Sequence, residues 1–190
     1  GSWLIKSLNV LGIDLAGKTA EKIGRLVEEP GSEHKKWLGL SRCTLDTGKF
    51  KLEKPYNGKP TKRASDNEGP YLLFIHGTLS STWGSFGELW SEDRKDELSE
   101  LHARYEDRVL GFDHRTLTES PIDNTIQLIR ELNNYLPGDA EVHLVTHSRG
   151  GLVGELLCWD AKVPLPEENF FRSNKENEQL RKPLESLRRE

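Results

Sequence analysis

The chain has 190 residues, the length of one ordinary domain, and carries a net charge of −4. Its lysines and arginines form no basic stripe, which argues against a nucleic-acid partner, and no run approaches the ~20 apolar residues of a membrane span. Cys43 and Cys158 match no metal or redox spacing, so we expect a reduced, cytoplasmic protein without a metal or cofactor.

The first 70 residues divide into two predicted segments. Residues 1–30 have apolar residues at helical spacing and are predicted to form an N-terminal helical segment. Residues 31–70 are predicted to hold a hairpin, made by residues 38–45 and 49–53, followed by a polar loop rich in Gly, Pro, Lys and Asp.

A rival motif lies inside the N-terminal segment. Residues 12–19, Gly-Ile-Asp-Leu-Ala-Gly-Lys-Thr, fit the phosphate-binding pattern G-x-x-x-x-G-K-[ST]. A phosphate cradle prefers small residues that turn their N–H groups inward, and an inward Asp14 would repel the anion. Leu11 and Leu15 also fit ordinary helix packing. Helix packing is therefore the favoured interpretation, and a P-loop nucleotide-binding protein is the alternative.

Residues 71–162 alternate between strand-like and helix-like patterns, which predicts a core of parallel strands with flanking helices. Ser120, Pro121 and Asp123 form a strong helix start, with an N-cap serine, a proline at the first position and an acid in the first turn. The strands are predicted at residues 71–75, 108–112 and 142–146, and the helices at residues 85–90, 95–104, 121–136 and 151–161.

The strand at 142–146 leads directly into a candidate nucleophile. Thr146-His147-Ser148-Arg149-Gly150 resembles the nucleophile elbow G-x-S-x-G, with threonine in place of the first glycine. In such an elbow the serine is thrust out of a tight strand-to-helix turn, flanked by small residues because backbone passes close by. We therefore predict Ser148 as the nucleophile, with positive or near-forbidden φ. An ordinary Ser-Arg-Gly-Gly loop is the alternative.

A second loop supplies the expected partner of the elbow. Hydrolysis of an ester passes through a tetrahedral oxyanion, which needs two preorganised N–H donors. One is expected from Arg149, the residue after the nucleophile, and the other from Thr78, in the loop after the strand at 71–75. Gly77 would let the backbone approach the substrate, and His76 is expected to be a buried, supporting histidine.

Five segments of the sequence together resemble a known protein family. The residues that carry the resemblance are 73–78, 80–83, 113–117, 121–124 and 147–153. They resemble the oxyanion strand and elbow of lipase-like α/β hydrolases, and as a whole the bacterial hydrolase-like modules that accompany caspase-like CHAT domains. The resemblance implies an incomplete α/β-hydrolase fold, mostly a parallel sheet with flanking helices, and a serine hydrolase of esters or amides.

The catalytic triad of this superfamily runs serine, acid, histidine along the chain. No histidine follows His147, and Asp160 is expected to face away from the site, so the acid and histidine cannot be identified here. The chain also begins Gly-Ser without methionine, and 34% hydrophobic content is low for such a core. We therefore expect a fragment, truncated before the later strands, that needs a missing C-terminal half or partner domain. Residues 163–190 would be a charged helical tail.

Three further choices between interpretations stay open. Without a base the serine is a poor nucleophile, so the chain is expected to be inactive or weakly active, or to be a non-catalytic binding or regulatory module. Asp113 and His114 form either a displaced acid and base or, as we favour, a polar cluster that shapes a loop. Trp83 and Trp90 either line an acyl pocket or belong to the core.

Overall fold

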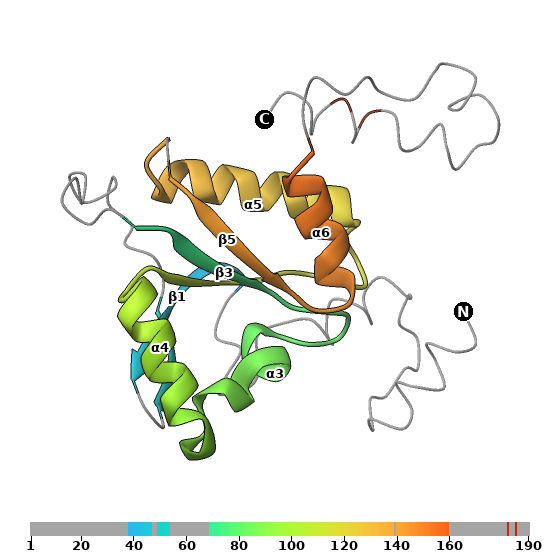
Figure 1. Ribbon diagram of the computed structural model, residues 1–190. Coiled ribbons are helices and arrows are strands. Elements are labelled where there is room, and N and C mark those ends of the chain that lie inside the picture. Colours follow the sequence, from blue (N-terminus) through green and yellow to red (C-terminus); the bar gives the residue numbers. More distant parts are fainter. Residues whose placement is uncertain are drawn as a thin grey trace, which may run out of the picture.

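A computed structural model describes residues 38–46, 49–53, 69–138 and 140–159, together with Lys182 and Glu185 (Figure 1). The predicted N-terminal helical segment and its P-loop motif lie outside the described residues, as does nearly all of the predicted C-terminal tail. The boundaries proposed for these segments stay predictions.

Five strands form one mixed sheet. Their order is β2-β1-β4-β3-β5, in which β3 pairs in parallel with β4 and β5, while β1 pairs antiparallel with β4 and β2. The strands are β1 (Gly39–Asp46), β2 (Lys49–Glu53), β3 (Tyr71–Ile75), β4 (Val109–Asp113) and β5 (Val142–Thr146). The predicted hairpin is confirmed as β1 and β2, and the predicted α/β class is confirmed.

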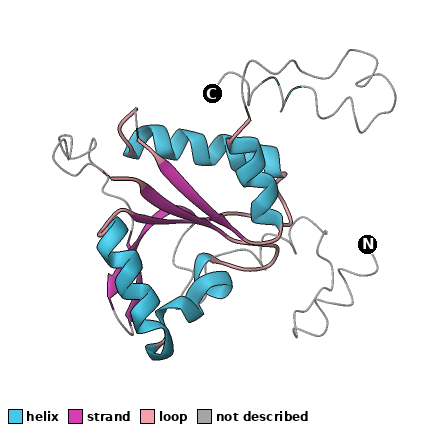
Figure 2. Ribbon diagram, viewed as in Figure 1, coloured by secondary structure: helices cyan, strands magenta, loops and turns pink. Residues whose placement is uncertain are grey.

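Helices cover both faces of the sheet, with α5 and α6 on one face and α3 and α4 on the other (Figures 1 and 2). They are α3 (Thr82–Phe86), α4 (Lys95–Tyr105), α5 (Pro121–Tyr135) and α6 (Arg149–Leu157), with the short 3-10 helices η1 (Gly87–Trp90) and η2 (Glu92–Arg94) between α3 and α4. The helix predicted at 85–90 is thus the end of α3 and η1, and α6 starts two residues earlier than predicted. The two layers bury separate apolar clusters against β3 and β4.

The start of α5 follows its sequence signals. The Ser120 hydroxyl accepts a hydrogen bond from the Asp123 N–H, and the Asp123 carboxylate accepts one from the Ser120 N–H. This capping box holds the entry to α5 and so fixes the loop that connects it to β4. Within the described part of the chain, no helix has the length and apolar character needed to cross a membrane.

Candidate functional site

Ser148 sits between β5 and α6, and its backbone has φ 52° and ψ −120°. Only Leu79, Glu106 and Ser148 have positive φ among the described non-glycine residues. Such a conformation is strained for a side-chain-bearing residue and is held only by its surroundings. The predicted backbone strain at Ser148 is therefore confirmed, and its side chain is exposed. Its role as a nucleophile stays a prediction.

Gly150 explains how this turn is held. A Cβ atom built on Gly150 would lie 2.2 Å from the Ile75 carbonyl oxygen and 2.7 Å from that of His76. The first turn of α6 therefore packs directly on the end of β3, and only glycine fits there. The His147 N–H also donates to the Ile75 carbonyl oxygen at 3.0 Å, which extends the β3–β5 pairing into the elbow.

Gly77 brings the second predicted loop against the elbow. A Cβ on Gly77 would lie 3.0 Å from Ser148 Cβ and 2.9 Å from His147 Nδ1. The missing side chain thus lets the loop after β3 rest on the serine turn, although 71 residues of sequence separate the two loops. The predicted site residues His76, Gly77 and Thr78 therefore adjoin His147, Ser148 and their neighbours, as the sequence led us to expect.

The backbone N–H groups of Thr78 and Leu79, in the loop after β3, differ in their hydrogen bonding. The Leu79 N–H donates to Thr116 Oγ1 at 3.0 Å, so it is occupied. Thr78 is exposed, and its N–H makes no hydrogen bond with any residue that the structure describes. Arg149 is the first residue of α6, so its backbone N–H lies at the N-terminal end of the helix. The arrangement fits the two predicted oxyanion donors.

His76 is fully buried and holds this loop from below. Its Nε2 accepts a hydrogen bond from the His114 N–H at 3.0 Å, so the ring proton lies on Nδ1, which donates to the Gly77 carbonyl oxygen at 2.8 Å. Its Nε2 also lies 3.6 Å from the Asp113 carboxylate. This matches the supporting role expected for His76.

Asp113 and His114 are both about 1% exposed, so neither can reach a substrate above Ser148. Asp113 Oδ1 accepts a hydrogen bond from the Thr82 N–H at 2.8 Å, and the His114 ring stacks on His76 with centroids 4.2 Å apart. These contacts favour the loop-shaping interpretation over a displaced acid and base.

The Arg149 side chain turns away from Ser148. Its guanidinium donates to the Glu119 carbonyl oxygen and to Asn124 Oδ1, and Asn124 in turn donates to the Glu119 carboxylate at 2.9 Å. Sequence reasoning missed this network and Thr116, because no local pattern marks a residue whose partner lies on another loop. The Arg149 network ties the start of α6 to Glu119 and to the start of α5, whereas Thr116 ties the loop after β4 to Leu79.

The described residues contain no evident base for Ser148. Its hydroxyl makes no hydrogen bond there, and the nearby His147 ring is 3.5 Å from Ser85 Oγ. Asp160 lies outside the described residues. Groups of three or more metal-binding side chains are likewise absent from the described part of the chain.

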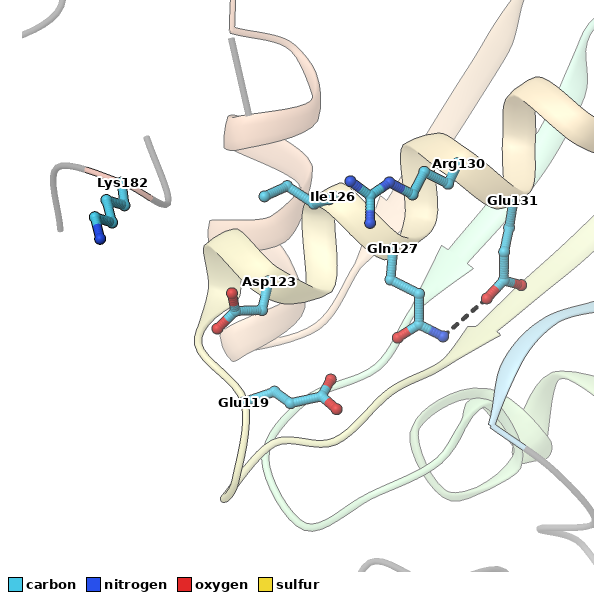
Figure 3. A pocket seen from close by; sticks show the side chains of 7 residues that line it. All are labelled: Glu119, Asp123, Ile126, Gln127, Arg130, Glu131 and Lys182. Atoms are coloured by element: carbon cyan, nitrogen blue, oxygen red, sulfur yellow. Dashed lines mark hydrogen bonds between the residues drawn. The ribbon is translucent and has the colours of Figure 1, made fainter. Parts of the chain in front are cut away.

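Two cavities are lined by residues that the structure describes. One, of about 660 Å³, lies beside α5 and is lined by Glu119, Asp123, Ile126, Gln127, Arg130, Glu131 and Lys182 (Figure 3). None of the predicted site residues lines it. The other, of about 550 Å³, is lined in part by Trp83, Phe86 and Val145. Trp90 instead belongs to the core, where its Nε1 donates to the Thr44 carbonyl oxygen.

Comparison with known proteins gives one match. The family described as "Domain of unknown function (DUF7379)" matches residues 38–174, which include every strand of the sheet and the elbow. No curated protein and no solved structure matches the chain.

Proposed function

The chain belongs to the DUF7379 family, whose function is unknown, and we propose that it is the nucleophile-bearing part of a serine hydrolase of esters or amides. Ser148 would attack the carbonyl carbon, and the Thr78 and Arg149 N–H groups would stabilise the oxyanion. The observation that carries the proposal is the strained Ser148, at φ 52°, packed against Gly77 of the other loop. The lipase-like motifs in the sequence support the same chemistry.

The site needs an acid and a histidine that the described residues do not provide. We propose that polypeptide outside them completes the triad by adding to the free edge of β5. At the opposite edge, β2 exposes the charged Lys51 and Glu53, the kind of residues that protect natural sheet edges. β5 reads Val-His-Leu-Val-Thr, has no such charge, and leaves Val145 39% exposed.

The direction in which the chain crosses the sheet also favours the edge of β5 as the place where a further strand would add. α5 carries the chain from β4 across to β5, and α6 lies on the same face of the sheet (Figure 1). Because strand–helix–strand connections are right-handed, a parallel strand that follows α6 would lie beyond β5. Its C-terminal end would then reach the edge of the sheet where Ser148 lies.

Labelling with a fluorophosphonate probe tests the proposal. The 190-residue chain alone should label slowly, because only the oxyanion hole and binding remain when triad members are missing. Adding the missing polypeptide, as a longer protein or a second chain, should raise labelling strongly, and Ser148→Ala should abolish it. If the longer protein folds and stays unlabelled, the proposed serine-hydrolase function is contradicted.

That last outcome would favour a second function, a non-catalytic hydrolase-like module that binds a partner or regulates a neighbouring domain. The observation in its favour is that Ser148 Oγ makes no hydrogen bond to a histidine among the described residues. A module of this kind would keep its partner in the Ser148→Ala variant, whereas a hydrolase would lose turnover. If the wild type and Ser148→Ala pulled down the same partner and neither was labelled, the binding module would be the function.

A further inference from the structure

The end of β4 and the loop after it make three hydrogen bonds to the segment that runs from the end of β3 to the start of α3. We propose that Asp113, His114 and Thr116 are positioning residues that aim the Thr78 N–H at the oxyanion above Ser148. This inference rests on the proposed hydrolase function. The three bonds, of 2.8 to 3.0 Å, join Asp113 Oδ1 to Thr82 N–H, His114 N–H to His76 Nε2, and Thr116 Oγ1 to Leu79 N–H.

The bond from His114 sets the direction of one peptide plane. Because His76 Nε2 accepts that bond, its Nδ1–H is left to donate to the Gly77 carbonyl oxygen at 2.8 Å. A trans peptide directs its C=O and N–H to opposite sides, and no cis peptide occurs among the described residues. With the Gly77 carbonyl held toward the buried ring, the Thr78 N–H of the same peptide points away from it.

The bond from Thr116 fixes the next residue. Leu79 has φ 55°, a conformation that a leucine adopts only when its surroundings impose it. Its N–H is held by Thr116 Oγ1, a side chain that is 7% exposed. The bond therefore holds the strained turn and removes the Leu79 N–H from competition, so that Thr78 supplies the donor.

Asp113 fixes the far end of the same loop. It is the last residue of the buried strand β4 and is 1% exposed, so its carboxylate is a rigid anchor for the first N–H of α3, at Thr82. A charged acceptor makes a stronger hydrogen bond than a neutral one. The loop is thus tied at three points to the end of β4 and the residues after it, while Thr78 and Leu79 stay exposed and Leu79 carries the backbone strain.

Thr116→Val removes the acceptor and keeps the shape of the side chain. Thr116→Ser keeps the hydroxyl, and Thr44→Val is a matched control on β1. By amide hydrogen exchange in the 190-residue chain, the Leu79 amide should exchange at least fivefold faster in Thr116→Val than in the wild type, and at nearly the wild-type rate in Thr116→Ser and Thr44→Val. Equal Leu79 exchange in all four proteins would overturn the inference.

Fluorophosphonate labelling of Ser148 in the completed protein gives the second readout. Removing an oxyanion donor costs about 10²–10³-fold in rate, so a misdirected Thr78 N–H should slow labelling at least tenfold in Thr116→Val, with recovery in Thr116→Ser. The inference would also be overturned if Thr116→Val exchanged its Leu79 amide faster but was labelled as fast as the wild type. If the wild type itself stays unlabelled, the proposed function fails, and the exchange of Leu79 still decides whether Thr116 holds the loop.

Discussion

Replacing Gly150 by alanine probes the contact that holds the serine turn. The new Cβ would lie 2.2 Å from the Ile75 carbonyl oxygen, whereas ordinary contacts lie at 3.4–4 Å, so α6 must move by more than 1 Å. The three nearest atoms, the Ile75 and His76 carbonyl oxygens and the Ile75 carbonyl carbon, belong to backbone, which cannot rotate aside as a side chain can. Overpacking costs about 1–3 kcal/mol, and the better helix propensity of alanine offsets at most about 1 kcal/mol. We expect a loss of about 2 kcal/mol in the free energy of unfolding.

Gly151→Ala is the matched control in the same turn of α6. Its Cβ would meet only Thr146 Oγ1, at 3.8 Å, which is ordinary contact. Helix propensity alone should then stabilise this variant by up to about 1 kcal/mol. Urea denaturation followed by circular dichroism measures both. If Gly150→Ala were as stable as Gly151→Ala, α6 would not pack on the end of β3 as described, and the structural argument for the elbow would fail.

Four further measurements test Ser148, the start of α5 and the buried Cys43. Ser148→Gly should raise the free energy of unfolding by about 1 kcal/mol, because glycine adopts φ 52° without strain, and Ser148→Ala should not. Ser120→Ala should lower it by about 1 kcal/mol through loss of the capping box, and Ser120→Gly by only a few tenths, in the same denaturation assay. Burial, reinforced by the Asp113 carboxylate, raises the pKa of the Cys43 thiol well above its usual range. A thiol reagent should therefore modify exposed Cys158 in the folded protein and Cys43 only on unfolding. Because the unfolded thiol ionises near pH 8.5 and the folded one does not, stability should fall as pH rises above about 8.5, and Cys43→Ala should lose this component.

The sequence predicted helices and strands well where the residues that determine an element lie within a few positions of one another. The strand at 142–146 is confirmed to the residue as β5, because its alternation ends in the small and polar residues of a turn. Ser120 and Asp123 marked the start of α5, since a capping box needs only residues three apart. The backbone of Ser148 was predictable for the same reason, because a serine between an apolar strand and a glycine-rich helix start has few conformations available.

The packing that joins the two loops was not predictable in the same way. That Gly150 meets Ile75, and that Leu79 bonds Thr116, depends on β3 lying between β4 and β5, which no single segment encodes. For the same reason the sequence did not decide whether Asp113 and His114 form an acid–base pair or a loop-shaping cluster. Both roles use the same residue types.

Burial and bonding partners decide that choice in physical terms. A base must exchange its proton with a substrate, and a side chain with 1% exposure below His76 has no path to one. The same buried position suits an anchor, because it excludes the water that would compete for the hydrogen bonds. The polar residues at the end of β4 therefore suit the anchoring of the loop after β3 rather than acid–base chemistry on a substrate.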